Sequence, residues 1–206
     1  MRIIVALTAI SVLITLAIVT GCGQKPAVKP QTPASGSATS GQPVAGTPPV
    51  AVASAPAEGM YRVTSEKGYS IDILSDWTEH QNPGYGIDKM YMRPRAGDDD
   101  SFGENINILV EALPYEMSAS EYAAKGAEQL TKQMNATIIS NASFMGVIPG
   151  NKHVFTLNMK NVDTKTASIV FVKNKTAYVI TCTASPATYS QYESKFDQMA
   201  RTLQVL

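Results

Sequence analysis

The segment that decides the fold is Asn105-Ile106-Asn107-Ile108-Leu109-Val110-Glu111-Ala112-Leu113, followed by Pro114. Its apolar and polar side chains alternate, and such period-two alternation indicates a β-strand with an apolar face and a polar face. The apolar face would carry Ile106, Ile108, Val110 and Ala112. Proline cannot donate a ladder hydrogen bond, so Pro114 is expected to end the strand.

Further strands are expected on both sides of this segment. Residues 61–66 and 68–74 alternate around a Glu-Lys-Gly turn and predict a hairpin, and residues 88–92 predict a third strand. The later strands are expected at 137–147, with a bend, and at 153–160, 167–173 and 177–184. Residues 169–172 are apolar on both faces, which indicates a central strand covered on each side.

Two helices are expected among these strands. Ser118 and Glu121 have the spacing of a capping box, which predicts a helix from there to about Met134. A second helix is expected to begin within 186–188, since apolar side chains then recur every three or four residues as far as Leu203. Hairpin-length links and this order of elements predict an α+β fold, a largely antiparallel β-sheet flanked by helices.

The first residues have the features of an export signal. Arg2 precedes an apolar run over 3–19, and small residues stand directly before Cys22. Val19-Thr20-Gly21-Cys22 resembles the lipobox of bacterial lipoproteins, which implies a signal peptide over 1–21 and a diacylglycerol on the Cys22 thiol. The run is somewhat shorter than the ~20 residues of a membrane-spanning helix, which leaves an uncleaved signal anchor as the alternative. Lipidation would place the protein at the cell membrane or outer membrane, facing the extracytoplasmic side.

Residues 22–57 are expected to be a tether between this anchor and a globular domain over 58–206. Pro, Ala, Gly, Ser, Thr, Val and Gln dominate the segment, its only charges are Lys25 and Lys29, and it has no aromatic residue. Such a composition cannot bury a core, so the tether is expected to be disordered. It could give the domain reach toward a partner, or it could be a passive spacer.

Charge and cysteine content narrow the functional classes. The chain has 17 basic and 17 acidic residues, so we expect no nucleic-acid partner, because such binding depends on cationic contacts to phosphates. Its two cysteines are Cys22 and Cys182. Once Cys22 is lipidated, Cys182 has no partner within the chain, and we expect it to be a small buried side chain in a strand.

Several of these segments together resemble the PsbP-like domain. They are 68–73 leading to Asp76-Trp77, then 105–111, 177–184 and 189–203. The family includes an extrinsic subunit of photosystem II and bacterial envelope lipoproteins, some of them close to DcrB-type proteins. Over residues 60–206 the resemblance implies an antiparallel sheet between helices. It also implies a non-catalytic assembly or binding role.

The candidate binding surface consists of Trp77, Tyr85 and Tyr91, which surround a loop rich in glycine and proline. Aromatic side chains are favoured at binding surfaces. Packing in the core is the alternative, above all for Trp77.

No motif predicts a catalytic residue, a metal site or a cofactor. Asp98-Asp99-Asp100, with Glu104 nearby, could offer oxygen ligands to Ca²⁺, but it lacks the alternating spacing and glycine of a calcium loop. His80 and His153 are too far apart for a metal-binding spacing, and we expect His153 to be an edge or core residue.

We therefore expect a membrane-anchored, non-catalytic accessory or binding module for an envelope protein or a cell-wall component. The alternative is a small-ligand or metal-binding receptor, or an enzyme, whose site is assembled only in the fold.

Overall fold

A computed structural model of the chain describes residues 55–81, 84–97, 100, 102–159 and 161–206. The predicted signal peptide, Cys22 and most of the predicted tether lie outside these residues, and so do Asp98 and Asp99.

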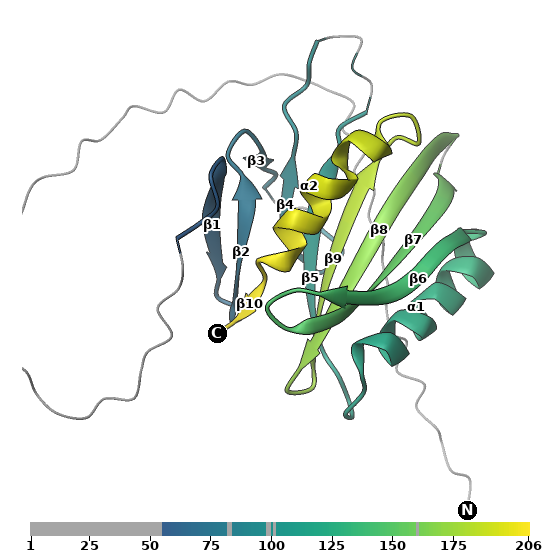
Figure 1. The fold of residues 1–206 in the computed structure, drawn as a ribbon. Helices are drawn as coiled ribbons and strands as arrows, with labels where there is room; N and C mark the ends of the chain where they lie inside the picture. The colour runs from purple at the N-terminus through teal and green to yellow at the C-terminus, as the bar shows by residue number, and fades with distance from the viewer. Residues whose placement is uncertain (1–54, 82–83, 98–99, 101, 160) are drawn as a thin grey trace, which may run out of the picture. The chain divides into compact units, whose positions relative to one another are not determined.

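The described residues form two antiparallel sheets (Figure 1). The smaller sheet has the order β1-β2-β10 and the larger sheet the order β3-β4-β5-β9-β8-β7-β6. Strand β5 pairs with β4 and β9, and Ile108 of β5 lies opposite Ile180 of β9. The strands of the smaller sheet are β1 (Met60–Ser65), β2 (Tyr69–Leu74) and β10 (Gln204–Val205). Those of the larger sheet are β3 (Thr78–Glu79), β4 (Ile87–Met92), β5 (Asn105–Ala112), β6 (Thr137–Met145), β7 (Pro149–Met159), β8 (Val162–Lys173) and β9 (Thr176–Ala184).

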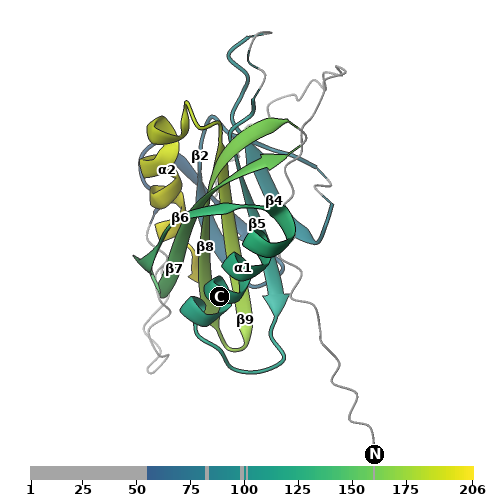
Figure 2. The same ribbon diagram turned by 90° about the vertical axis from the view of Figure 1, so that its right-hand side faces the viewer.

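The helices α1 (Ala119–Met134) and α2 (Tyr189–Arg201) pack against opposite faces of the larger sheet (Figure 2). Tyr122 of α1 shares a buried cluster with Val170 of β8, whereas Phe196 of α2 shares another with Phe171. Neighbouring residues of a strand point to opposite faces, so these contacts place one helix on each side of β8. Strand β8 is therefore covered on both faces, as the apolar segment 169–172 indicates.

The α+β fold with its largely antiparallel sheet is confirmed. The capping box is present as well: the Ser118 hydroxyl accepts from the Glu121 N–H, and the Ser118 N–H donates to Glu121 Oε2 at 2.7 Å. The predicted bend is a register shift between Ile138 and Ser140 of β6.

The structure differs from the prediction at the starts of β7 and β8 and in two short strands. Strand β8 begins at Val162 rather than at Ala167, because residues 162–166 still pair with β7. Strand β7 begins at Pro149 rather than at His153, because its first residues still pair with both β6 and β8. The two-residue strands β3 and β10 were not predicted, since segments so short carry no periodic signal.

Cys182 is fully buried, as predicted, in the cluster that α2 covers. Burial raises the pKa of its thiol well above the ordinary value, so the side chain is a neutral core residue.

Candidate functional site

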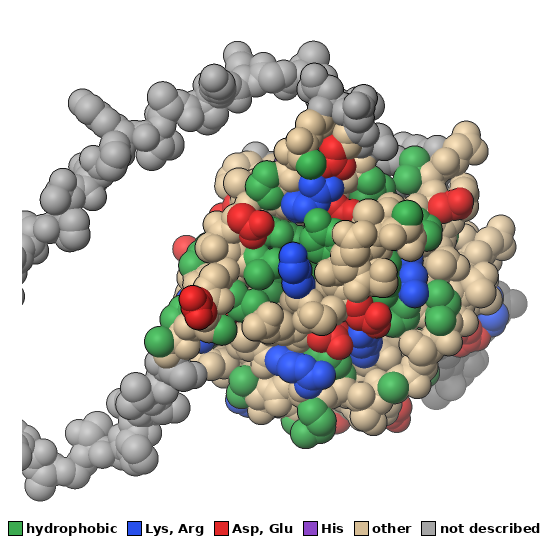
Figure 3. Space-filling model, turned by 45° about the horizontal axis from the view of Figure 1, so that its top comes forward, with side chains coloured by type: hydrophobic (Ala, Val, Ile, Leu, Met, Phe, Trp, Pro, Cys, Tyr) green, Lys and Arg blue, Asp and Glu red, His purple; other side chains and the backbone are tan. Residues whose placement is uncertain are grey.

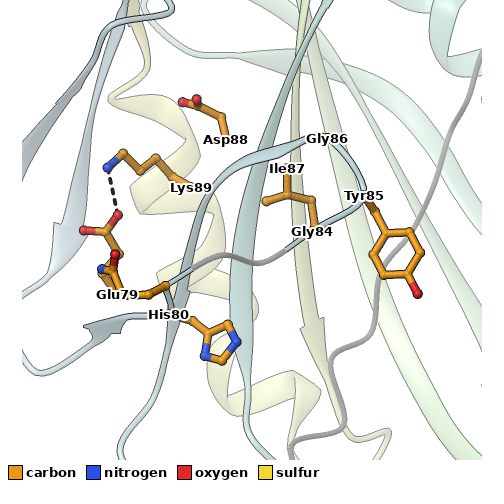
Figure 4. Close-up of a pocket in the computed structure, with 9 residues that line it drawn as sticks. Glu79, His80, Gly84, Tyr85, Gly86, Ile87, Asp88 and Lys89 are labelled. Atoms are coloured by element: carbon orange, nitrogen blue, oxygen red, sulfur yellow. Dashed lines mark hydrogen bonds and ion pairs between the residues drawn. The ribbon is translucent and has the colours of Figure 1, made fainter.

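An exposed aromatic turn marks the candidate site. Gly84, Tyr85 and Gly86 all have left-handed backbone, with φ angles of 74°, 53° and 77°, and the Ile87 N–H closes the turn on the Gly84 carbonyl at 3.0 Å. Glycine adopts this conformation freely, whereas a tyrosine there is strained. The Tyr85 side chain is 65% exposed and extends from the tip of the turn (Figure 4).

The turn borders an open cavity of about 490 Å³, which β3, β4 and the described residues between them line. Charged side chains of both signs belong to the lining, and Lys89 Nζ contacts Glu79 Oε1 at 2.8 Å (Figure 4). The hydrogen bond to Glu79 raises the pKa of Lys89. The lining residues are Glu79, His80, Gln81, Gly84, Tyr85, Gly86, Ile87, Asp88 and Lys89.

Asp88 joins this cavity to the smaller sheet. A register shift in β4 falls between Ile87 and Lys89, and such bulges re-aim a side chain. Asp88 Oδ2 accepts from the Ser65 hydroxyl at 2.6 Å and from the Tyr69 hydroxyl at 2.8 Å, while Lys67 Nζ lies 3.4 Å from Oδ1. Burial alone would raise the pKa of Asp88, but these hydroxyls and Lys67 outweigh it and hold the pKa below its usual value. Asp88 is therefore a fixed anion that links the two sheets.

The predicted surface of three aromatic residues is wrong for two of them. Trp77 is 3% exposed and packs edge-on against Phe196 at 6.1 Å between ring centroids. Tyr91 is 1% exposed and lies 6.4 Å from the Tyr61 ring. Both rings belong to the same buried hydrophobic cluster, so only Tyr85 of the predicted surface is accessible.

Asp100 and Glu104, the described members of the predicted acidic cluster, both bind an arginine. Arg93 donates to Asp100 through both terminal nitrogens, at 2.7 and 3.0 Å, and to Glu104 through Nε at 2.6 Å. The Thr188 hydroxyl donates to the second oxygen of Glu104 at 2.6 Å. The Arg93 hydrogen bonds lower the pKa of Asp100 to about 2. These contacts tie Arg93, Asp100 and Glu104 to the start of α2.

The two histidines do not meet. His80 lines the cavity, whereas His153 lies in β7, only 2% exposed and stacked on Phe155 with 5.6 Å between ring centroids. Among the described residues no three His, Cys, Asp or Glu side chains lie close enough together to hold a metal ion.

No local pattern in the sequence predicts that Glu79 lies beside Asp88 and Lys89. They converge because β3 pairs with β4 and because the bulge in β4 turns Asp88 toward the smaller sheet. The Gly-Tyr-Gly triplet was the detectable signal, since two glycines beside an aromatic residue are compatible with a left-handed turn.

Charges of both signs are interspersed on one face of the domain (Figure 3). On the face drawn in Figure 3, Lys and Arg side chains lie among Asp and Glu side chains. Neither helix in the described part of the chain is long and apolar enough to cross a membrane.

Comparison with known proteins identifies the fold. No protein-family model matches the sequence, and no curated protein matches it significantly. Among solved structures, cyanobacterial PsbP (CyanoP) from Synechocystis is similar with a TM-score of 0.55 and 13% identity, over 72% of this chain and 93% of that one. The Pseudomonas aeruginosa protein PA94, of unknown function, is similar with a TM-score of 0.52 and 15% identity, over 71% of this chain and 97% of that one. The described domain therefore has a PsbP-like α+β fold.

Proposed function

We propose that this chain is a lipid-anchored envelope protein whose PsbP-like domain is a non-catalytic binding module, with the Tyr85 turn as its principal contact. The observation that carries the proposal is the exposure of Tyr85 on a strained left-handed turn beside a cavity with charges of both signs. Strained backbone persists where the surrounding structure enforces it, and it is concentrated at functional sites.

The backbone cost at Tyr85 supports a role for its side chain. A non-glycine residue in the left-handed region costs about 1–2 kcal/mol, and the exposed ring makes no compensating aromatic contact with other described residues. Tyrosine is enriched among the few residues that supply most of the binding energy at interfaces. A partner that covers this ring would recover apolar area that the free domain leaves in water.

The neighbouring charges would orient such a partner. Asp88 is fixed by two hydroxyls and a lysine, and Glu79 and Lys89 form a partly exposed ion pair at the rim. Fixed charges at the rim of an interface mainly determine orientation and association rate. The ionised groups near the turn are thus arranged as paired, positioned charges, which suits recognition better than acid-base chemistry.

The proposed anchor is the lipidated thiol of Cys22. The support is the apolar run followed by Val19-Thr20-Gly21-Cys22 and the Pro- and Ala-rich segment before the domain. Two acyl chains hold a protein stably at a bilayer, whereas one gives reversible binding. The partner would then be an envelope protein or a cell-wall component within reach of the tether.

The cavity supports a second candidate, a receptor for a small polar ligand. Its volume of about 490 Å³ lies within the range of small-molecule sites. Glu79, His80, Asp88 and Lys89 would supply the polar contacts.

Site-specific photocrosslinking in cells would test the binding role. A benzophenone amino acid in place of Tyr85 should give a defined adduct with one envelope component, while the same group at Tyr115 serves as the control. Tyr115 is also exposed, at 52%, but does not have left-handed backbone. Equal, diffuse labelling from both positions, or none from position 85, would contradict the proposed contact. A saturable gain in thermal stability with a small polar ligand, abolished by Lys89→Met, would favour the receptor.

A further inference from the structure

Among the described residues, strand β6 is an unpaired edge of the larger sheet. It is the outermost strand beyond β7, and its nine residues, Thr137–Met145, include neither a charge nor a proline. Most of its side chains are exposed. Natural edge strands usually carry lysine, proline or inward charges, because their unpaired N–H and C=O groups can pair with another chain. The opposite edge, β3, is only two residues long.

Two features delimit the part of β6 that can accept another strand. At one end, Ile139 falls at the register shift between Ile138 and Ser140 and is left out of the pairing with β7. At the other end, the Arg201 guanidinium donates to the Met145 carbonyl. The regular edge between these points runs from Ser140 to Phe144, and its middle residue is Ala142.

We propose that two copies of this chain pair through their β6 edges, antiparallel, about a two-fold axis at Ala142. In this register Ser140 faces the other copy's Phe144 and Asn141 faces its Ser143. A two-fold interface requires one surface that complements itself. No charge faces a like charge, because the strand has none.

The exposed apolar side chains at the two ends of the edge favour a second copy as the occupant. Ile139 is 52% exposed and Met145 is 65% exposed. The axis at Ala142 brings Ile139 of each copy next to Met145 of the other, just beyond the paired residues 140–144, so a single symmetric contact covers both pairs. Long side chains that flank a paired segment are within reach of each other across the two strands.

The resulting dimer is expected to be weak, because one short edge buries less than the roughly 800 Å² per partner of a standard stable interface. The formal charge of zero removes net repulsion between copies. The inference concerns a surface distinct from the Tyr85 turn and stands independently of the proposed function.

Disulfide trapping tests the register directly. The full-length chain with Cys22→Ala retains only the buried Cys182, so an introduced thiol is the only accessible one. Residues directly opposite on antiparallel strands have Cα atoms about 4.5–5.5 Å apart, within the roughly 4.4–6.8 Å that a disulfide spans. Ala142→Cys, purified in detergent and oxidised with diamide, should therefore form a covalent dimer.

Matched variants separate this register from random collision. Asn141→Cys alone should form little dimer, but mixed with Ser143→Cys it should form the cross-linked heterodimer. Lys132→Cys, on the exposed surface of α1, gives the background level. The proposal predicts several-fold more dimer for Ala142→Cys than for Lys132→Cys, and a loss of that excess when Ile139→Lys is added. Equal dimer from the two single-cysteine variants, or adducts of Ala142→Cys only with other proteins in cells, would overturn it.

Discussion

Acidification should destabilise this domain through one buried histidine. His153 is 2% exposed, and neither of its ring nitrogens has a hydrogen-bond partner among the residues that the structure describes. Its neighbours in register on the adjacent strands, Ser168 and Asn141, are uncharged, and no charged group contributes to the shift of its pKa among the described residues. Burial lowers the pKa of His153 to about 4, whereas the unfolded chain has the ordinary value of about 6.5.

The sign and size of the effect follow from this difference. His153 is neutral in the folded protein, and its contribution is complete above about pH 6.5, where the unfolded chain is neutral too. As the pH falls toward about 4 the unfolded chain takes up the proton first, so the free energy of unfolding decreases by about 1.4 kcal/mol per pH unit. Between about pH 7 and pH 5 the loss is about 2 kcal/mol, and over the whole interval about 3 kcal/mol.

Urea unfolding at the two pH values, followed by circular dichroism, would measure this loss. The variant His153→Leu removes the titrating group and two unpartnered polar atoms, so it should lose much less stability on acidification. His80→Gln is the matched control, since it removes the other histidine from the open cavity, and it should keep the wild-type loss. If His153→Leu loses as much stability between these pH values as the wild type, the buried neutral histidine is not responsible.

Three further substitutions test the contacts that hold the domain together. Arg93→Met leaves Glu104, which is 1% exposed, without its cationic partner, and should reduce the free energy of unfolding by about 3–5 kcal/mol in denaturant titration; a loss below 1 kcal/mol would contradict the buried pair. Gly150→Ala would place a Cβ 2.6 Å from the Val170 carbonyl oxygen, so calorimetry should show a lower melting temperature, with a cost of about 1–3 kcal/mol; an unchanged melting temperature would refute the close approach. Ser118→Ala removes the cap of α1 and should cost about 1 kcal/mol in the same titration, while Ser118→Asp should retain most of it.

Local periodicity was sufficient to predict the longer strands and the two helices. The alternation in 105–113 and 177–184 predicts strands that the structure pairs with each other, with Ile108 opposite Ile180. The capping box predicts where α1 begins, because both of its hydrogen bonds lie within four residues of chain. Strand alternation and the capping box can be predicted from sequence because each depends only on residues that are close together in the chain.

The candidate site could be predicted only in part, because its geometry depends on contacts between distant segments. Tyr85 and Tyr91 look equivalent in the sequence, yet Tyr91 lies in β4 and points into the core, while the turn directs Tyr85 into solvent. In the sequence Asp100 and Glu104 belong to an acidic cluster. Only the fold shows that Arg93 lies between them and donates hydrogen bonds to both. The alternation of β5 likewise does not indicate that Asn105 and Asn107, on its polar face, are themselves buried.

Whether this chain is an anchored binding module depends on the lipidation of Cys22. Cells that express the chain would be fed an alkyne fatty acid, and the protein would be isolated and probed for the label in the wild type and in Cys22→Ala. The wild type should be strongly labelled, the label should be lost completely in Cys22→Ala, and that variant should fractionate differently from the lipidated wild type. Absence of label from the wild type, together with unchanged fractionation of Cys22→Ala, would contradict the proposed lipidation.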